Sequence, residues 1–145
     1  MRLNDVSRIL TIIGLVVELI VFLTAIGFGL FMVVQNDFFL SLIREQNLPS
    51  TQEDFLLIVM NGLGYLLIGV GLLIFIVFII NLFLFTKLIS HRFDQNKMRK
   101  VLIYQSVWGG INLLFNQVSG VLYLISGLNG LNEMNKDKES IREGL

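Results

Sequence analysis

The sequence predicts an all-α membrane protein with four transmembrane helices in one bundle. Of its 145 residues, 54% are hydrophobic and only 15% are charged, whereas soluble domains carry about 25% charged residues. Nearly all the apolar residues fall in three blocks, 9–34, 55–85 and 101–131. Each block exceeds the roughly 20 residues that a helix needs to cross a bilayer. We therefore expect one membrane domain, 1–145, and no separate soluble domain.

The first expected span, 8–34, is interpreted as a retained helix. Arg2 and Arg8 precede its apolar run, and Ala25-Ile26-Gly27 resembles a signal cleavage site. The run is longer than the roughly 7–15 residues of a signal core, so we expect that it is not removed. Either of two polar residues is expected to cap this helix, Asp5 or Ser7.

Residues 35–54 form the longest expected loop, and apolar residues recur there at helical spacing, at positions 38, 39, 42 and 43. This spacing predicts a short interfacial helix, which Pro49 ends. Overlapping capping-box patterns at Ser50 and Thr51 then start the second span, 55–86.

The third apolar block, 101–131, contains no charge. As one helix it would be roughly 46 Å long, whereas the hydrocarbon core is about 30 Å thick. A break at Asn116-Gln117 divides it into spans 100–115 and 118–132, a short helical hairpin. A chain with three spans is the alternative that the sequence leaves open.

The distribution of basic residues predicts the orientation. Residues 86–100 carry five Lys or Arg and residues 35–54 carry one, and basic loops stay in the cytoplasm. The loop 87–99 is therefore expected inside and the loop 35–54 outside. Both termini, including the tail 133–145, are expected in the cytoplasm of a multi-pass cell-membrane protein.

Glu18 is the only charged residue inside the three apolar blocks. It lies roughly 15 Å along the helix from Arg8, near mid-bilayer, where an ionisable group suggests a proton relay, a cation site or a counter-ion. The other interpretation is a protonated carboxyl group bonded to an amide on a neighbouring helix, because burial disfavours the charged form. Three amides are candidates, with the first at similar depth and the others shallower: Asn112, Gln105 and Asn81.

Glycines at helical spacing predict close helix packing, within this molecule or against a partner. The glycines in question are Gly14, Gly62, Gly64, Gly69, Gly71, Gly109, Gly120 and Gly127. Two aromatic residues on the third span have different expected places. Tyr104 is shallow enough for the interfacial aromatic belt, whereas Trp108 is expected to pack with its N–H seeking a partner.

The sequence shows no acid pair, nucleophile–base set or metal-ligand spacing, and it has no cysteine and one histidine. We expect no catalytic, cofactor or metal site and therefore no enzyme. The 11 basic and 11 acidic residues balance, so nucleic acid is not expected as a partner. The expected partners are the lipid bilayer and another membrane protein or a second copy of this chain.

Two stretches resemble a known family. Arg8-Ile-Leu-Thr-Ile-Ile-Gly14 lies in the first span, and Gly120-Val-Leu-Tyr-Leu-Ile-Ser-Gly127-Leu-Asn-Gly-Leu131 forms the last. Both are similar to a family of small bacterial four-span membrane proteins, of Gram-positive type, whose function is unknown. The resemblance implies four spans, short third and fourth helices and no known catalysis.

The sequence favours a non-enzymatic membrane protein that acts through helix–helix contacts, as an accessory or regulatory subunit or as an immunity-type protein. The alternative is a small proton-coupled multidrug-type exporter that uses Glu18. A pore-forming, holin-like protein is a third hypothesis, which the long first loop disfavours.

Overall fold

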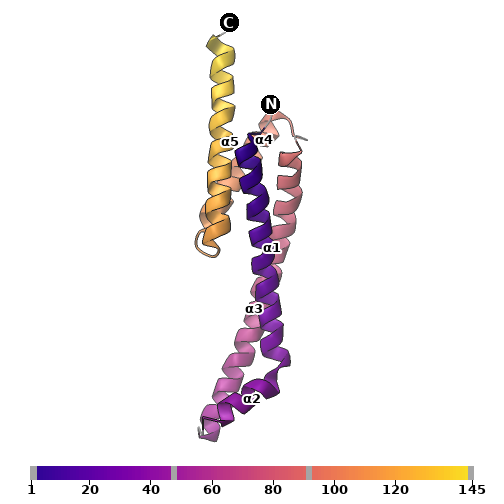
Figure 1. Cartoon of the computed structure of the whole chain (residues 1–145), viewed down its shortest axis with the longest axis vertical. Helices are drawn as coiled ribbons and strands as arrows, with labels where there is room; N and C mark the ends of the chain where they lie inside the picture. The colour runs from indigo at the N-terminus through magenta and orange to yellow at the C-terminus, as the bar shows by residue number, and fades with distance from the viewer. Residues whose placement is uncertain (1–2, 47–48, 91–92, 144–145) are drawn as a thin grey trace. The chain divides into compact units, whose positions relative to one another are not determined.

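The computed structural model describes residues 3–46, 49–90 and 93–143, and this part of the chain is all-α. It contains no strand and five helices: α1 (Asp5–Val34), α2 (Asn36–Arg44), α3 (Ser50–Ile89), α4 (Gln95–Asn112) and α5 (Gln117–Glu143) (Figure 1). Two of them, α1 and α3, are long and apolar enough to cross a membrane by length and composition. The all-α class is confirmed, and the count of four spans stays a prediction.

The helices α4 and α5 both extend beyond the spans expected for them into polar sequence. The helix α4 begins at Gln95, before the expected boundary at residue 100, because Asp94 caps it by accepting a hydrogen bond from Lys97 N at 2.7 Å. The helix α5 begins at Gln117, at the expected break, but continues to Glu143. The tail expected from residue 133 is therefore an extension of α5.

The caps of α1 and α3 differ from those expected. Asn4, rather than Asp5 or Ser7, caps α1, since its Oδ1 accepts a hydrogen bond from Val6 N at 3.0 Å. Ser50 already belongs to α3, whose first hydrogen bonds run to the carbonyl oxygen of Pro49.

The helix α2 confirms the short helix predicted in the first loop. It ends at Arg44, so Pro49 does not terminate it. Two residues of the predicted charge asymmetry, Arg2 and Arg92, lie outside the described residues.

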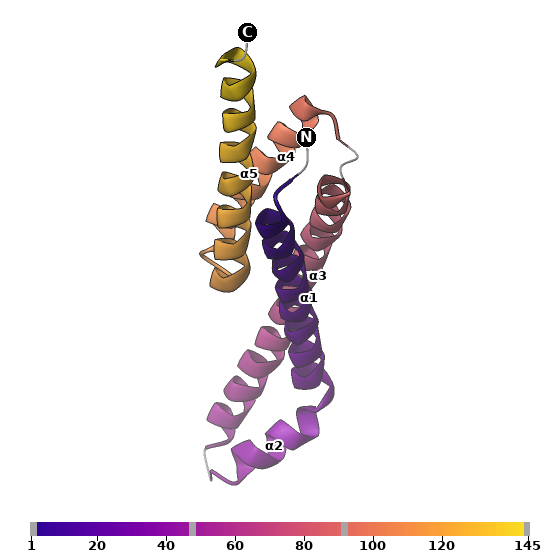
Figure 2. The same ribbon diagram turned by 45° about the horizontal axis from the view of Figure 1, so that its top comes forward.

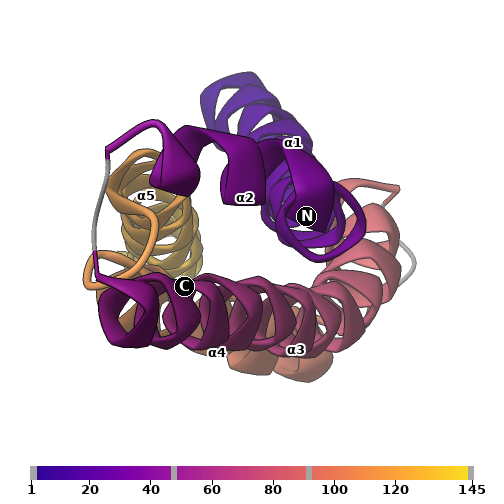
Figure 3. The same cartoon turned by 90° about the horizontal axis from the view of Figure 1, so that it is seen from below.

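The chain divides into two compact units, and α1 and α3 contribute a segment to each. One unit comprises Ile20–Val77. There α2 leaves α1 at a sharp angle and leads toward the start of α3 (Figures 2 and 3). Glycines let α1 and α3 approach closely, because a Cβ at Gly29 would lie 2.8 Å from the carbonyl oxygen of Gly64. Phe22 and Phe75 also pack there, with ring centroids 5.0 Å apart.

The other unit comprises Met1–Leu19 and Phe78–Leu145. Within it α4 and α5 form an antiparallel hairpin with backbones in close contact (Figure 1). A Cβ at Gly109 would lie 2.5 Å from Leu124 N, and one at Gly120 would lie 2.6 Å from Leu113 N. Small residues are what allow such close approach between membrane helices.

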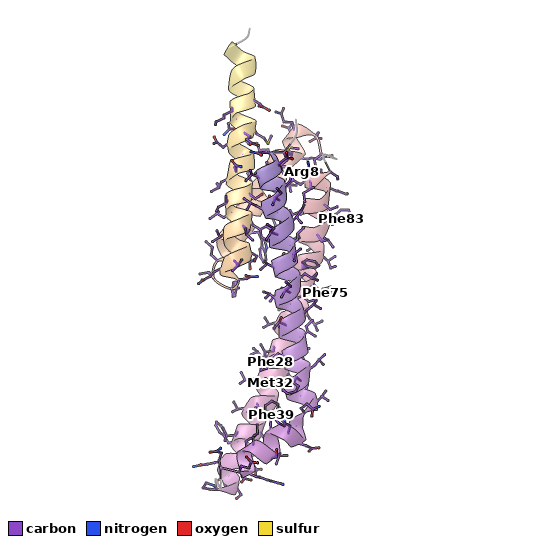
Figure 4. The ribbon with its side chains drawn as sticks, viewed as in Figure 1. Arg8, Phe28, Met32, Phe39, Phe75 and Phe83 are labelled. Carbon is purple, nitrogen blue, oxygen red and sulfur yellow. The ribbon has the colours of Figure 1, made fainter. Side chains whose placement is uncertain are left out.

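This second unit has polar groups inside and apolar groups outside. All eight buried polar residues recorded in the described chain lie in it: Ser7, Thr11, Glu18, Asn81, Gln105, Asn112, Ser119 and Ser126. Its exposed side chains include apolar residues on both hairpin helices: Ile103, Val107, Ile111, Val118, Val121, Ile125 and Leu128. Phe83 likewise projects outward from α3 (Figure 4). Water-soluble domains show the reverse preference for polar residues.

We predict that Gly109→Ala destabilises the α4–α5 hairpin by about 1–3 kcal/mol, the usual cost of overpacking. The added methyl group would meet backbone atoms of Leu124 and Gly120, which cannot rotate away. Thermal unfolding in detergent measures the effect. Gly110→Ala is the matched control, since nothing lies within 4 Å of its Cβ position. Equal melting temperatures for the two variants would contradict this packing.

Candidate functional site

Glu18 lies where four helices meet. It belongs to α1, and only 2% of its surface is exposed. Asn81 Nδ2, from α3, donates hydrogen bonds to both carboxylate oxygens at 3.1 and 3.2 Å. Trp108 Nε1, from α4, donates to Oε1 at 3.2 Å. The Tyr123 hydroxyl, from α5, donates to Oε2 at 2.8 Å. One carboxylate therefore joins all four helices of this unit.

These hydrogen bonds engage both oxygens of the Glu18 side chain. An ionised carboxylate offers about four lone-pair sites, and the indole N–H and amide NH₂ groups can only donate. Oε1 receives Asn81 and Trp108, and Oε2 receives Asn81 and Tyr123. A cation would have to displace one of these donors. The geometry is that of a junction between helices rather than that of an open ligand site.

Neighbouring side chains orient the donors. The Tyr104 hydroxyl donates to Asn81 Oδ1 at 2.7 Å, so the NH₂ end of this amide faces Glu18. A Cβ at Gly14 would lie 2.5 Å from Tyr123 Cε1, which shows that glycine makes room for the Tyr123 ring beside α1. Phe85 packs on Tyr123, with ring centroids 5.1 Å apart.

A second polar cluster lies about two to three turns before Glu18 along α1. Gln105 Nε2 donates to Thr11 Oγ1 at 2.8 Å, and the Thr11 and Ser126 hydroxyls lie 2.8 Å apart. Both hydroxyls also contact the carbonyl oxygen of Ser7, at 2.7 and 2.8 Å. Gln105 Oε1 is buried and has no hydrogen-bond partner among the described residues. This cluster ties α1 to both helices of the hairpin.

The amide partners of Glu18 differ from the depth estimate. Asn112, expected opposite Glu18, instead donates to Ser119 Oγ at 2.6 Å, beside the α4–α5 turn. Gln105 bonds Thr11, and only Asn81 reaches Glu18. The expected depth of Asn112 assumed a helix that begins at residue 100, whereas α4 begins at Gln95. Trp108 is as far from the first residue of α4 as Glu18 is from that of α1.

Sequence reasoning missed Tyr123 as a partner of Glu18 and assigned Tyr104 to the interfacial belt. The hydroxyl of Tyr104 instead bonds Asn81 in the polar interior of the unit. A signal for Tyr123 is present in the sequence. It lies between Gly120 and Gly127 in an apolar helix, where a buried hydroxyl requires a partner.

The candidate packing glycines fall into two groups. Six lie where an added Cβ would meet neighbouring atoms closer than 3.0 Å: Gly14, Gly64, Gly71, Gly109, Gly120 and Gly127. Gly62 and Gly69 have nothing within 4 Å of the Cβ position. These two therefore make no close helix contact within the described chain.

Comparisons with family models, curated proteins and solved structures found no match to this chain. The resemblance to small four-span bacterial proteins stays a prediction.

We predict that Tyr123→Phe lowers the free energy of unfolding by about 0.6–1.7 kcal/mol, from the average to the largest value measured for interhelical hydrogen bonds in a membrane protein. The variant removes one donor from the Glu18 carboxylate and keeps the ring. Reversible unfolding in mixed detergent measures the loss. Tyr65→Phe removes a hydroxyl from a residue that is 64% exposed and is the matched control. A loss of equal size in both variants would argue against the junction.

Proposed function

We propose that this chain is a non-enzymatic integral membrane protein that acts through helix–helix contacts. It serves as an accessory or regulatory subunit of a membrane complex, or as an immunity-type protein that shields a membrane target. The observation that carries the proposal is the Glu18 junction, in which the donors of three helices use the acceptor sites of the buried carboxylate. A group engaged in this way holds the helices together. The outward-facing side chains of those helices then form a defined surface.

The distribution of side chains supports placing α4 and α5 in the membrane together with α1 and α3. Amides and hydroxyls of the hairpin helices face inward, where they bond one another, and apolar residues face outward. Polar residues of membrane bundles have the same preference for the interior. Averaging both faces in one hydropathy window lowers the value for α4 and α5. We infer a four-helix membrane bundle, with the lipid bilayer around it.

Contacts near the N-terminus support an orientation with both termini in the cytoplasm. The backbone N–H and side-chain amide of Asn4 both donate to the Glu133 carboxylate on α5. The residues next to this pair in the sequence, Leu3 and Met134, are both buried. The start of α1 and the polar part of α5 therefore share one end of this unit. The basic residues of α4 lie at its first turns, which supports assigning the hairpin ends to the basic, cytoplasmic side.

We predict that a reporter fused after Leu145 is active only as a cytoplasmic reporter. A reporter inserted after Glu45, between α2 and α3, is predicted to be active only outside. Paired phosphatase and fluorescent-protein fusions measure the two sides. An external signal from the fusion after Leu145 would contradict an even number of membrane crossings.

The alternative is a small proton-coupled multidrug-type exporter. The observation that favours it is the burial of Glu18, because ionisable groups among membrane helices are typical of proton pathways. The four hydrogen bonds to its carboxylate count against it. A transported cation would bind only after breaking one of them, and no second acidic residue lies among the buried polar groups of the described chain.

Glu18→Gln tests the two functions against each other. The variant replaces one acceptor oxygen by an NH₂ group that faces donors, so we expect a lower melting temperature and loss of a stoichiometric membrane partner on purification from native membranes. Resistance to cationic drugs is expected to be unchanged. Glu45→Gln, at an exposed position, is the matched control. Loss of drug resistance with an unchanged melting temperature would support the exporter and overturn the contact function.

A further inference from the structure

The turn between α4 and α5, residues 113–116, exposes apolar side chains at its tip. Leu114 is 82% exposed and Phe115 is 79% exposed, the two largest values among the large hydrophobic residues of the described chain. Turns in water are dominated by Gly, Pro, Asn, Asp and Ser. The nearest charges along the sequence are Lys100 and Glu133. The tip therefore has the composition of a surface that contacts hydrocarbon.

The backbone of this turn satisfies its own donors. The N–H groups of all four turn residues bond carbonyl oxygens at 2.7–3.1 Å: Leu113 to Gly109, Leu114 to Ile111, Phe115 to Asn112, and Asn116 to Asn112. Ser119 N at the start of α5 donates to Asn116 Oδ1 at 3.3 Å. Backbone without water must find such partners within the protein. The N–H groups of this turn meet that requirement without an aqueous loop.

Helix length places the tip short of the far side of the bilayer. From Lys100 to Phe115 the chain rises at most roughly 22 Å, whereas the hydrocarbon core is about 30 Å thick. Reaching the far interface would require thinning the bilayer by roughly 8 Å, and each ångström of mismatch costs a fraction of a kcal/mol. The Asn112 amide gains no partner by reaching that interface, because it already bonds Ser119.

Apolar surface is continuous from both helices to the tip. Exposed apolar residues recur every three or four positions along the hairpin: Ile103, Val107 and Ile111 on α4, and Val118, Val121 and Ile125 on α5. Gln117 is the exposed polar residue beside the turn. Its amide is uncharged, so placing it in hydrocarbon costs much less than placing a charge there.

We propose that the α4–α5 turn ends inside the hydrocarbon of the bilayer, with Leu114 and Phe115 in contact with lipid acyl chains. The hairpin then enters and leaves on the cytoplasmic side, while α1 and α3 cross the membrane. This inference rests on the proposed membrane placement of α4 and α5 and specifies how deep they reach. It is consistent with the two helices that are long and apolar enough to cross.

The chain has no cysteine. Single-cysteine variants therefore test how deep the α4–α5 turn lies in the bilayer, with no labelling of other cysteines in the chain. Phe115→Cys and Leu114→Cys replace exposed side chains and are expected to fold normally. In sealed vesicles of either orientation, a membrane-impermeant maleimide is expected to label them at least about tenfold more slowly than the controls, because only the thiolate reacts and it forms in water. The controls are Glu45→Cys for the outside and Asn135→Cys for the inside.

A nitroxide attached at Phe115→Cys gives the second measurement. We expect frequent collisions with oxygen, which dissolves in hydrocarbon, and few with a water-soluble nickel complex. Labelling as fast as at Glu45→Cys would overturn the inference, since the tip would then reach water. Few collisions with both reagents would also overturn it, because protein would cover the tip. Release of the chain by an alkaline wash would instead overturn the proposed membrane function.

Discussion

The structure of the second unit depends on the four hydrogen bonds to the Glu18 carboxylate. A carboxyl group removed from water needs hydrogen-bond partners for its oxygens. Three donors from different helices meet this requirement at Glu18, so α1, α3, α4 and α5 must keep one register relative to one another. Two further features serve the same constraint. The Tyr104 hydroxyl orients the Asn81 amide, and the absence of a side chain at Gly14 makes room for the Tyr123 ring.

The glycines of the hairpin solve a different physical problem. In the membrane placement that we propose for α4 and α5, apolar side chains gain little from packing together. Helix association then depends on close approach and on interhelical hydrogen bonds. Gly109, Gly120 and Gly127 supply the close approach between α4 and α5. Asn112 and Ser119 supply a hydrogen bond between the same helices. Glycine contacts and this hydrogen bond both lie between the two helices, whereas the apolar side chains of α4 and α5 face outward.

Sequence reasoning was most successful where one short segment carries the whole signal. The spacing of apolar residues predicted α2, and the amides at 116 and 117 predicted the break at which α5 begins. It was less successful at helix ends, where Asn4 and Asp94 supply caps that were not anticipated. Because α4 begins at Gln95 and not at residue 100, every residue on that helix lies further from its start than expected. Trp108, and not Asn112, consequently reaches Glu18.

The sequence by itself determined the all-α class, the apolar helices α1 and α3, and Glu18 as the exceptional residue, because composition and spacing along the chain carry these features. Only the tertiary structure decided which groups surround that carboxylate. Hydrogen-bond partners are set by helix register and rotation, and these depend on contacts between residues more than sixty positions apart, such as Glu18 with Asn81 and with Tyr123. It also showed the outward apolar faces of α4 and α5, which mean hydropathy conceals because it averages both sides of a helix.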